Sequence, residues 1–491
     1  MPTPSADTHG EYSSWVGLIY VFNLIVGTGA LTLPSVFAKA GWLLSTVLII
    51  FLAFVGFITV TFVIETMAVA NATIQIRKLQ SHKIDGESEA ARDSESESEE
   101  TNEQTAIINS GNRNMRRYFS LNQSVEMGQM AGLYFNKVGR ILFFASLCIY
   151  LYGDLAIYTT AISKSMSDLL CPNNHTEDNA TNFEDEFNID CFNNEISKVD
   201  LYRICVGIFA LLVCPFTYFD VQKTKYFQLA TTTMRWSAFS IMIAMASLRL
   251  YHGQNADHQP AMFTFHGLPA LIGASVYSFM CHHSLPGLIA PFNDKQYVLK
   301  QLAMDYGLIC TFYLLLSLTG VFAFRELNDL YTLNFVPSGD QTLSLFMEML
   351  LYFLGMFPIF TLSTSFPIVA ITLQNNLKTL FLDPLLMDQY GFVVKRLTFP
   401  TLAIAPPIAV ALSTHDLGRL VEFTGSYAGT CIQYIIPAML VLQARKYCRR
   451  DIGANVRNKY ASPFRNVAWI YFVICWSLIC VVLVSINLFS A

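Results

Sequence analysis

The chain has 491 residues, of which 53% are hydrophobic and only 14% are charged, and its formal net charge is −5. Soluble globular proteins carry roughly 25% charged residues, so this composition excludes an ordinary soluble protein and indicates a chain that spans a lipid bilayer. The net charge is uninformative by itself, because the distribution of the charges matters more, and no nucleic-acid partner is expected.

The apolar segments predict an all-α membrane protein. A helix needs about 20 predominantly apolar residues to cross the hydrocarbon core of a bilayer. Residues 1–13 contain no Lys, no Arg and no apolar run, so we expect the first span to act as its own insertion signal. Eleven spans are predicted, at 15–37, 42–70, 139–165, 201–219, 227–250, 265–290, 301–324, 343–373, 397–412, 418–442 and 466–489.

The distribution of Lys and Arg predicts the orientation of these spans. With residues 1–14 in the cytosol, the loops after the even-numbered spans, with the adjoining span ends, hold 24 of the 31 Lys and Arg residues. Cytosolic loops carry an excess of these residues, so the C-terminus is expected in a lumen or outside the cell. This divides the chain into spans 1 and 2 (15–70), a cytosolic insertion (71–123), an interfacial segment with spans 3–5 (124–250), spans 6–10 (265–442), a basic cytosolic loop (443–465) and span 11 (466–489).

The first span contains several residues that weaken a helix. The stretch FNLIVGTGALTLP (22–34) places Asn23, Gly27, Thr28, Gly29 and a proline within an apolar run. A break here would present free N–H groups at one helix end and free carbonyls at the other, which suit a carboxylate and a cation respectively. The alternative is a glycine-lined contact between closely packed helices.

The cytosolic insertion is polar and acidic. Its middle, DGESEAARDSESESEE, cannot bury a core, so residues 71–123 are predicted to be disordered. It offers a site for a cytosolic partner, although a solvated linker is the plainer interpretation. Residues 124–140 are predicted to form an amphipathic segment at the membrane interface.

The third span contains an acidic residue, Asp154, within YLYGDLAIY. A carboxylate inside a membrane is a functional candidate by default, because its insertion is unfavourable. We interpret Asp154 either as a proton carrier or as an internal polar brace to a neighbouring tyrosine.

The loop after the third span, residues 166–200, is predicted to lie on the non-cytosolic side. It contains two glycosylation sequons, at Asn174 and Asn179. It also contains Cys171 and Cys191, which would face an oxidising compartment and form a disulfide. Glycosylation is compatible with a lysosomal or endosomal membrane and with the plasma membrane.

The sixth span repeats the features of the first. In GASVYSFMCHHSLPGLIAP (273–291), Tyr277, Ser278, Cys281 and His282 interrupt an apolar run, and Leu-Pro follows as it does in span 1. Spans 1 and 6 begin the two halves if the first ten spans form two repeats of five. A matching pair of interrupted spans is typical of transporters built from inverted repeats.

The eighth span offers hydroxyl oxygens in FPIFTLSTSFPI (357–368). Together with carbonyls from a broken helix, hydroxyls suit Na⁺. The alternative is that these side chains donate back to carbonyls of their own helix, as Ser and Thr often do. The sequence shows no spacing typical of a metal centre, a cofactor site or a nucleotide site.

These motifs resemble those of a known family. The run N-L-I-V-G-T-G followed by L-x-L-P-x-x-F-x-x-A-G-W, from Asn23 to Trp42, is similar to the first span of the amino acid/auxin permease family, which includes the sodium-coupled neutral amino acid transporters. The run C-H-H-S-L-P resembles the sixth span of that family. The resemblance implies a leucine-transporter-type fold with two inverted five-helix repeats, one extra helix and alternating access.

The resemblance also implies site residues. Gly27, Thr28 and Gly29 match the unwound loop that meets the substrate carboxylate, with Tyr277, Ser278, Cys281 and His282 from span 6 completing the substrate site. The coupling ion, if it is Na⁺, would be held by Asn23, by carbonyls near Val26 and by Thr361, Thr364 or Ser365. Asp154 departs from the sodium-coupled relatives, so Na⁺ and H⁺ coupling both stay open.

The expected function is therefore secondary active transport of amino acids or similar small zwitterions, driven by a cation gradient. A solute sensor on the same fold, signalling through the acidic insertion, is the alternative. A membrane enzyme that uses His282 or Asp154 is disfavoured, because no second catalytic group lies at a defined spacing.

Overall fold

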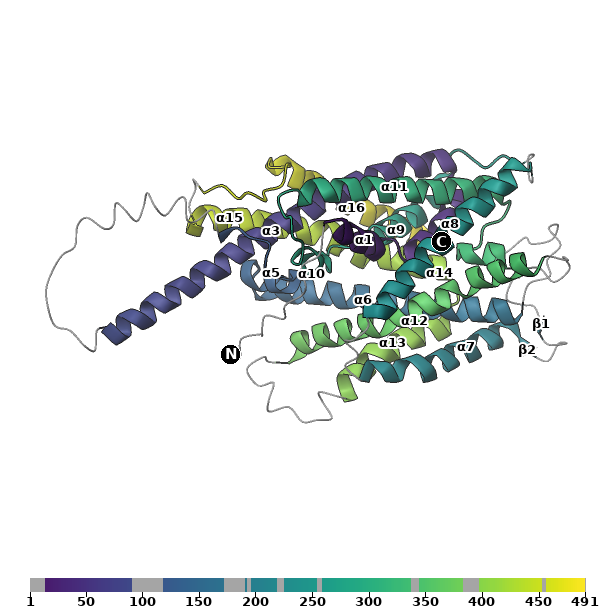
Figure 1. Ribbon diagram of the computed structural model, residues 1–491, viewed down its shortest axis with the longest axis horizontal. Coiled ribbons are helices and arrows are strands. Elements are labelled where there is room, and N and C mark those ends of the chain that lie inside the picture. Colours follow the sequence, from purple (N-terminus) through teal and green to yellow (C-terminus); the bar gives the residue numbers. More distant parts are fainter. Residues whose placement is uncertain are drawn as a thin grey trace.

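The computed structural model describes residues 14–90, 118–171, 190–191, 196–218, 225–253, 258–336, 344–382, 397–452 and 456–490. The sequons at Asn174 and Asn179 and the acidic tract from residue 91 onward lie outside the described residues. The described part of the chain is a bundle of long helices (Figure 1).

The first half of the bundle begins with a broken helix, α1 (Ser14–Ile25) and α2 (Thr28–Ala40). The elements that follow are α3 (Trp42–Ala90), α5 (Met127–Tyr134), α6 (Lys137–Leu170), the two-residue strands β1 (Asp190–Cys191) and β2 (Ile196–Ser197), α7 (Lys198–Val213), η2 (Cys214–Tyr218) and α8 (Lys225–Tyr251). These elements hold the predicted spans 1–5.

The second half also begins with a broken helix, α9 (Leu268–Ser278) and α10 (Leu285–Ile289), which follows η3 (Phe265–Gly267). The later elements are α11 (Val298–Ala323), η4 (Tyr331–Phe335), α12 (Leu345–Phe381), α13 (Phe399–Ser413), α14 (Leu417–Phe423), the π-helical segments η7 (Thr424–Gly429) and η8 (Cys431–Ile435), α15 (Ile436–Tyr447), η9 (Cys448–Ile452) and α16 (Val467–Ser490).

The bundle is all-α and suited to a membrane, but fewer of its helices qualify as spans than the eleven predicted. Among the described residues, seven helices are long and apolar enough to cross a bilayer, and the bent pair α1/α2 makes an eighth. Span 6 falls short because it is divided between α9 and α10. The span predicted at 397–412 is α13, whose 15 residues cover only about 22 Å at 1.5 Å per residue. The exact number of spans stays a prediction.

Helix α3 extends beyond residue 70, the predicted end of span 2. Helix α3 continues without interruption to Ala90, so the first part of the predicted disordered segment is helical. The segment predicted at 124–140 contains the helix α5, which buries Met127, Met130 and Ala131. A capping box between Glu126 and Gln129 begins this helix.

Apolar side chains lie on both the inside and the outside of the bundle. One cluster of fully buried residues joins α3, α9, α15 and α16 through Leu52, Ile272, Val441 and Val473. On the outside, α7 and α16 present exposed leucines, isoleucines and valines. In a membrane protein this outer surface faces lipid rather than water, so its exposure is stabilising.

A disulfide between Cys171 and Cys191 closes the loop after α6, which confirms the predicted pairing. Cys191 belongs to β1, and its strand partner in β2 is Ile196. The disulfide therefore ties the end of α6 to the hairpin that leads into α7.

Two buried ion pairs hold the same side of the bundle. The Lys164 ammonium lies 2.5 Å from the carboxylate of Asp329, and Lys198 lies 2.6 Å from Asp168. The other oxygen of Asp329 accepts from the backbone N–H of Leu417, so this carboxylate joins α6 to α14. Removal of one partner of such a pair is strongly destabilising, because it leaves the other charge buried and uncompensated, whereas the pair as a whole adds little net stability.

We expect Lys164→Met to lower the free energy of unfolding by about 3–5 kcal/mol, because it leaves the Asp329 charge buried and unpaired. The double variant Lys164→Met/Asp329→Leu should recover most of that loss, since both charges are gone. Thermal melting of the purified protein measures both variants. A double variant less stable than Lys164→Met would contradict this account.

Candidate functional site

The first break lies at Val26 and Gly27, between α1 and α2. The two helices are bent by 54° at this point. Gly27 is the N-cap of α2, with φ −122° and ψ −143°, and no side chain caps the helix. Thr28 and Gly29 belong to the first turn of α2, so the unwound part is narrower than the predicted Gly27–Gly29. Their backbone N–H groups lie at the positive end of a helix, where an anion is stabilised.

The second break separates α9 from α10 and spans Phe279 to Ser284. The chain leaves α9 through a turn in which Met280 donates to the carbonyl of Tyr277. It enters α10 at Leu285-Pro286, and a proline in the first turn of a helix sacrifices no hydrogen bond. The prediction of an interruption in span 6 is therefore confirmed.

The two breaks lie side by side in the middle of the bundle (Figure 1). A Cβ added at Gly29 would lie 2.6 Å from Ser278 Oγ and 2.7 Å from Ser278 Cα, so only glycine permits this approach of α2 to α9. The hydroxyl of Tyr313, on α11, lies 3.1 Å from the carbonyl oxygen of Ile25 and 2.8 Å from that of Ser278. This hydroxyl can donate its hydrogen to either break.

The surroundings of Gly27 differ from those of Gly29. Among the described residues, no atom lies within 4 Å of the position that a Cβ would take at Gly27. Four buried side-chain atoms near the breaks also have no hydrogen-bond partner in the described part of the chain, namely Asn23 Oδ1, Thr28 Oγ1, Ser275 Oγ and Ser426 Oγ. Buried polar atoms are normally paired, so this region is suited to a polar ligand or to water.

Asp154 lies next to the second break. Its Oδ1 accepts a hydrogen bond of 2.5 Å from the hydroxyl of Tyr277, which belongs to the last turn of α9. Tyr158, one turn along α6, also donates to this carboxylate. Asp154 is 7% exposed, and within the described ranges no Lys, Arg or His forms an ion pair with it. The carboxylate thus connects α6 to the broken span 6.

The carbonyl oxygen of Asn23 accepts a hydrogen bond from a cationic side chain. Arg235, on α8, donates to the carbonyl oxygen of Asn23, and the Asn23 amide donates to Thr232 Oγ1 at 3.1 Å. Arg235 lies within the span predicted at 227–250. Ten residues separate it from the start of α8, which places it about 15 Å along the helix. The sequence analysis did not identify Arg235 as a site residue. An arginine within an apolar segment was the available signal.

The hydroxyls of span 8 donate within their own helix. Thr361 donates to the carbonyl of Phe357 at 2.8 Å, and Thr364 and Ser365 both donate to the carbonyl of Thr361. No hydrogen bond joins them to α1 in the described part of the chain. Their helix, α12, packs instead on α6, α8 and α13. Among the described residues, these hydroxyls are therefore hydrogen-bonded within α12 and not to Asn23 or Val26.

The remaining span 6 residues face different neighbours. His282 Nε2 lies 2.8 Å from Thr59 Oγ1 on α3, and Cys281 Sγ lies 3.4 Å from the hydroxyl of Tyr306. Both side chains are fully buried. His282 thus connects the second break to span 2 through Thr59 of α3.

Span 10 contributes a feature that the sequence analysis did not identify. Its helix is π-helical at η7, and Gly425 approaches the carbonyl of Gly273 so closely that an added Cβ would lie 2.0 Å from the oxygen. Thr424 approaches Gly153 in the same manner on α6. Widened helical turns of this kind are frequent at functional sites. The pattern G-S-Y-A-G (425–429) was the available signal.

A family model of transmembrane amino acid transporter proteins matches residues 114–490. The match includes the second break, Asp154 and Arg235. It begins after the first break, so the motif at Asn23–Gly29 lies outside the matched residues.

Relatives match nearly the whole chain, the first break included. The Transmembrane protein 104 homolog of Drosophila melanogaster is 47% identical, over 98% of this chain and 97% of its own length. Transmembrane protein 104 of Homo sapiens is 46% identical over the same shares. The Transmembrane protein 104 homolog of Dictyostelium discoideum is 30% identical over 96% of each chain.

Proposed function

The chain belongs to the transmembrane amino acid transporter family, and we propose from this premise that it is a secondary active transporter of amino acids or similar small zwitterions. The paired breaks in spans 1 and 6 are the observation that carries the proposal. A zwitterion has one anionic and one cationic group, and the breaks offer free N–H groups and free carbonyls close together. Backbone outside helices is tolerated at membrane depth only where it lines such a protected site.

The solute is proposed to lie beside Gly27. The open space at this glycine adjoins the N–H groups of Thr28 and Gly29 and the unpaired hydroxyl of Thr28. A carboxylate in this space would accept from the start of α2, where the helix dipole favours negative charge. Tyr277 and Ser278 form the opposite side through α9. Alternating access would then follow from movement of α9 relative to α6 and α11.

The coupling ion is proposed to be H⁺ rather than Na⁺. A guanidinium already donates to the Asn23 carbonyl, where the resemblance placed Na⁺. A second cation within a few ångströms would be repelled in a low-dielectric environment. The span 8 hydroxyls, which would complete a Na⁺ site, form no hydrogen bond with α1 among the described residues and donate within α12 instead.

Asp154 is the proposed proton carrier. Its charged form accepts from Tyr277 and Tyr158, and these hydrogen bonds fix α9 against α6. Protonation removes the negative charge, which weakens the charge-assisted hydrogen bonds and releases the last turn of α9. The proton bound from one side of the membrane would be given up on the other, so that its passage is linked to the movement of the solute.

A solute-dependent change in melting temperature tests the binding site. A solute that binds the folded protein at a hundred times its Kd stabilises it by about 2.7 kcal/mol. We expect one or more neutral amino acids to raise the melting temperature of the purified protein in detergent, whereas their decarboxylated amines should not. Binding without transport in proteoliposomes would favour the sensor alternative. If no zwitterion stabilises the protein, the proposed substrate class is wrong.

Arg235 provides a separate test of the ion assignment. We expect Arg235→Gln to lower uptake about tenfold or more, because a hydrogen bond from a charged donor contributes roughly 1.5–3 kcal/mol. Thr232→Val removes only a contact between neutral groups, so it serves as the control and should have a smaller effect. Wild-type uptake should be unchanged when Na⁺ is replaced by choline. Stabilisation of the wild-type protein by millimolar Na⁺, but not by choline, would contradict the assignment.

A further inference from the structure

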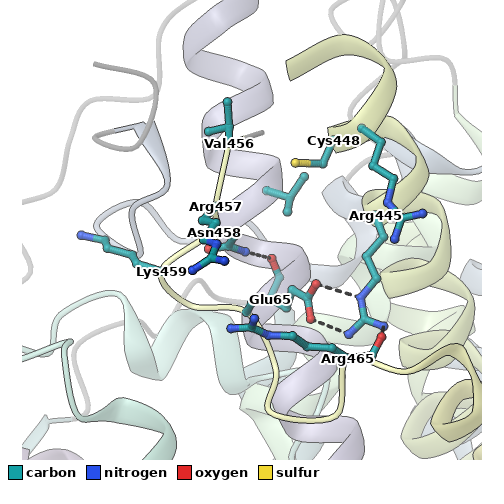
Figure 2. A pocket seen from close by; sticks show the side chains of 11 residues that line it. Glu65, Arg445, Cys448, Val456, Arg457, Asn458, Lys459 and Arg465 are labelled. Atoms are coloured by element: carbon teal, nitrogen blue, oxygen red, sulfur yellow. Dashed lines mark hydrogen bonds and ion pairs between the residues drawn. The ribbon is translucent and has the colours of Figure 1, made fainter. Parts of the chain in front are cut away.

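A pocket lined by cationic side chains lies between α3, α15 and the segment that precedes α16 (Figure 2). Its volume is about 570 Å³, which is in the range of small-molecule sites. Five cationic side chains line it against the single carboxylate of Glu65, namely Arg445, Arg449, Arg457, Lys459 and Arg465. We refer to this cavity as the basic pocket.

The wall of the basic pocket is fixed by Glu65. Its two carboxylate oxygens accept from the guanidinium of Arg445, both at 2.8 Å, and the exposed fractions of the two side chains are only 7% and 14%. The backbone N–H of Ser462 donates to Glu65 at 3.0 Å, and the side chain of Asn458 donates to its carbonyl. Figure 2 shows the carboxylate of Glu65 and the guanidinium of Arg445 pointing toward each other in this wall. This wall of the pocket is therefore preorganised.

Among the described residues, the other cations of the basic pocket have no carboxylate partner. Within the described ranges, no ion pair joins Arg449, Arg457, Lys459 or Arg465 to a carboxylate. The nearby Arg450 pairs with Asp451, but neither of these residues lines the pocket. Four unpaired positive charges around one cavity repel one another, so an anion in the cavity would be stabilised.

The position of the basic pocket matches the level of lipid headgroups. Two candidate spans, Leu417–Ile452 and Val467–Ile486, border the segment that contributes Arg457 and Arg465. The lining residues therefore lie where the chain leaves one span and enters the next. The sequence predicts that this face is cytosolic, and basic pockets between helices on that side suit anionic headgroups.

We propose that the basic pocket binds a polyanionic phosphorylated headgroup, such as that of a phosphoinositide. A monoanion would leave three positive charges unpaired, whereas two or more phosphate groups would neutralise them. Arginine matches phosphate through paired N–H donors, and three of the four unpaired cations are arginines. This site is separate from the paired breaks, so the proposal does not depend on the proposed transport activity.

Thermal melting of the full-length protein in detergent tests the proposal. The probes are short-chain phosphatidylinositol bisphosphate, phosphatidylcholine of the same chain length, and free inositol trisphosphate. The test variant is Arg457→Gln/Arg465→Gln, and the matched control is Lys446→Gln/Arg450→Gln, which removes two cations from the same region outside the lining. Both variants change the net charge equally, so a difference between them reports the pocket itself.

We expect the bisphosphate lipid, but not phosphatidylcholine, to raise the melting temperature. The affinity of the test variant for this lipid should be at least about tenfold lower, because at least one charge-assisted contact is lost. The affinity of the control should stay within about twofold of wild type. If inositol trisphosphate binds as tightly as the bisphosphate lipid, the headgroup alone is sufficient. If only the lipid binds, the ligand is a membrane lipid. Both outcomes support the site.

Three results would overturn the proposal. The first is the absence of stabilisation by either phosphate probe. The second is an equal loss in the test and control variants, which would indicate general surface charge. The third concerns deletion of residues 85–105. In this result the deletion lowers the melting temperature of the wild-type protein but not that of the test variant. That result would show that the acidic segment of the chain itself occupies the basic pocket.

Discussion

Replacement of Asp154 by asparagine should abolish solute accumulation driven by a pH gradient while leaving exchange of solute across the membrane intact. One proton per solute allows accumulation of about tenfold for each unit of pH gradient, because 1.4 kcal/mol corresponds to a factor of ten. Asparagine keeps the size of the side chain and can still accept from Tyr277. It cannot carry a proton, so the accumulation ratio should fall to one.

Two measurements on the same proteoliposomes separate coupling from folding. Net uptake against a pH gradient reports coupling, and exchange of labelled for unlabelled solute reports the binding site and its movement. Glu348→Gln, which neutralises an exposed carboxylate at the start of α12, is the control and should retain both activities. An Asp154→Asn protein that still accumulates solute in response to pH would show that the proton is carried elsewhere.

The two glycines at the first break should respond differently to substitution. Gly27→Leu should abolish solute binding without loss of folded protein, because its side chain would enter the open space beside α2. Gly29→Leu should reduce the yield of folded protein, because its Cβ would meet the backbone of Ser278 at 2.7 Å. Overpacking of this kind lowers the free energy of unfolding by about 1–3 kcal/mol or more. Melting temperature with and without solute distinguishes the two effects.

A Gly27→Leu protein that keeps its solute-dependent stabilisation would contradict the position proposed for the solute. A Gly29→Leu protein as stable as wild type would contradict the close approach of α2 to α9. The pair therefore tests two different statements about one short motif, with each variant serving as the control for the other.

The breaks were predictable from the sequence because their chemistry is local. Glycine and proline weaken a helix at the positions they occupy, so Gly27 and Pro286 marked interruptions in spans 1 and 6 without any knowledge of packing. The disulfide was predictable for a similar reason, since Cys171 and Cys191 share one loop. The family resemblance then indicated that the interruptions in spans 1 and 6 form a substrate site.

The contacts between helices were not predictable in the same way. Whether Asn23 faces the span 8 hydroxyls or Arg235 depends on how α1, α8 and α12 pack, and composition and spacing do not determine that packing. Among the described residues, Asn23 is hydrogen-bonded to α8 and the span 8 hydroxyls are hydrogen-bonded within α12, while Arg235 reaches the first break from within the predicted span 5. A criterion of length and composition does not recognise every predicted span, because a broken span and a short one fall below it.

The central claim is that a small zwitterion crosses the membrane through the paired breaks with a proton. Its most direct test is uptake of labelled neutral amino acids into proteoliposomes that hold the purified protein, under an imposed pH gradient, an imposed Na⁺ gradient or neither. The account predicts accumulation under the pH gradient alone, and none in proteoliposomes with Gly27→Leu. Accumulation driven by Na⁺, or equal uptake under all three conditions, would contradict it.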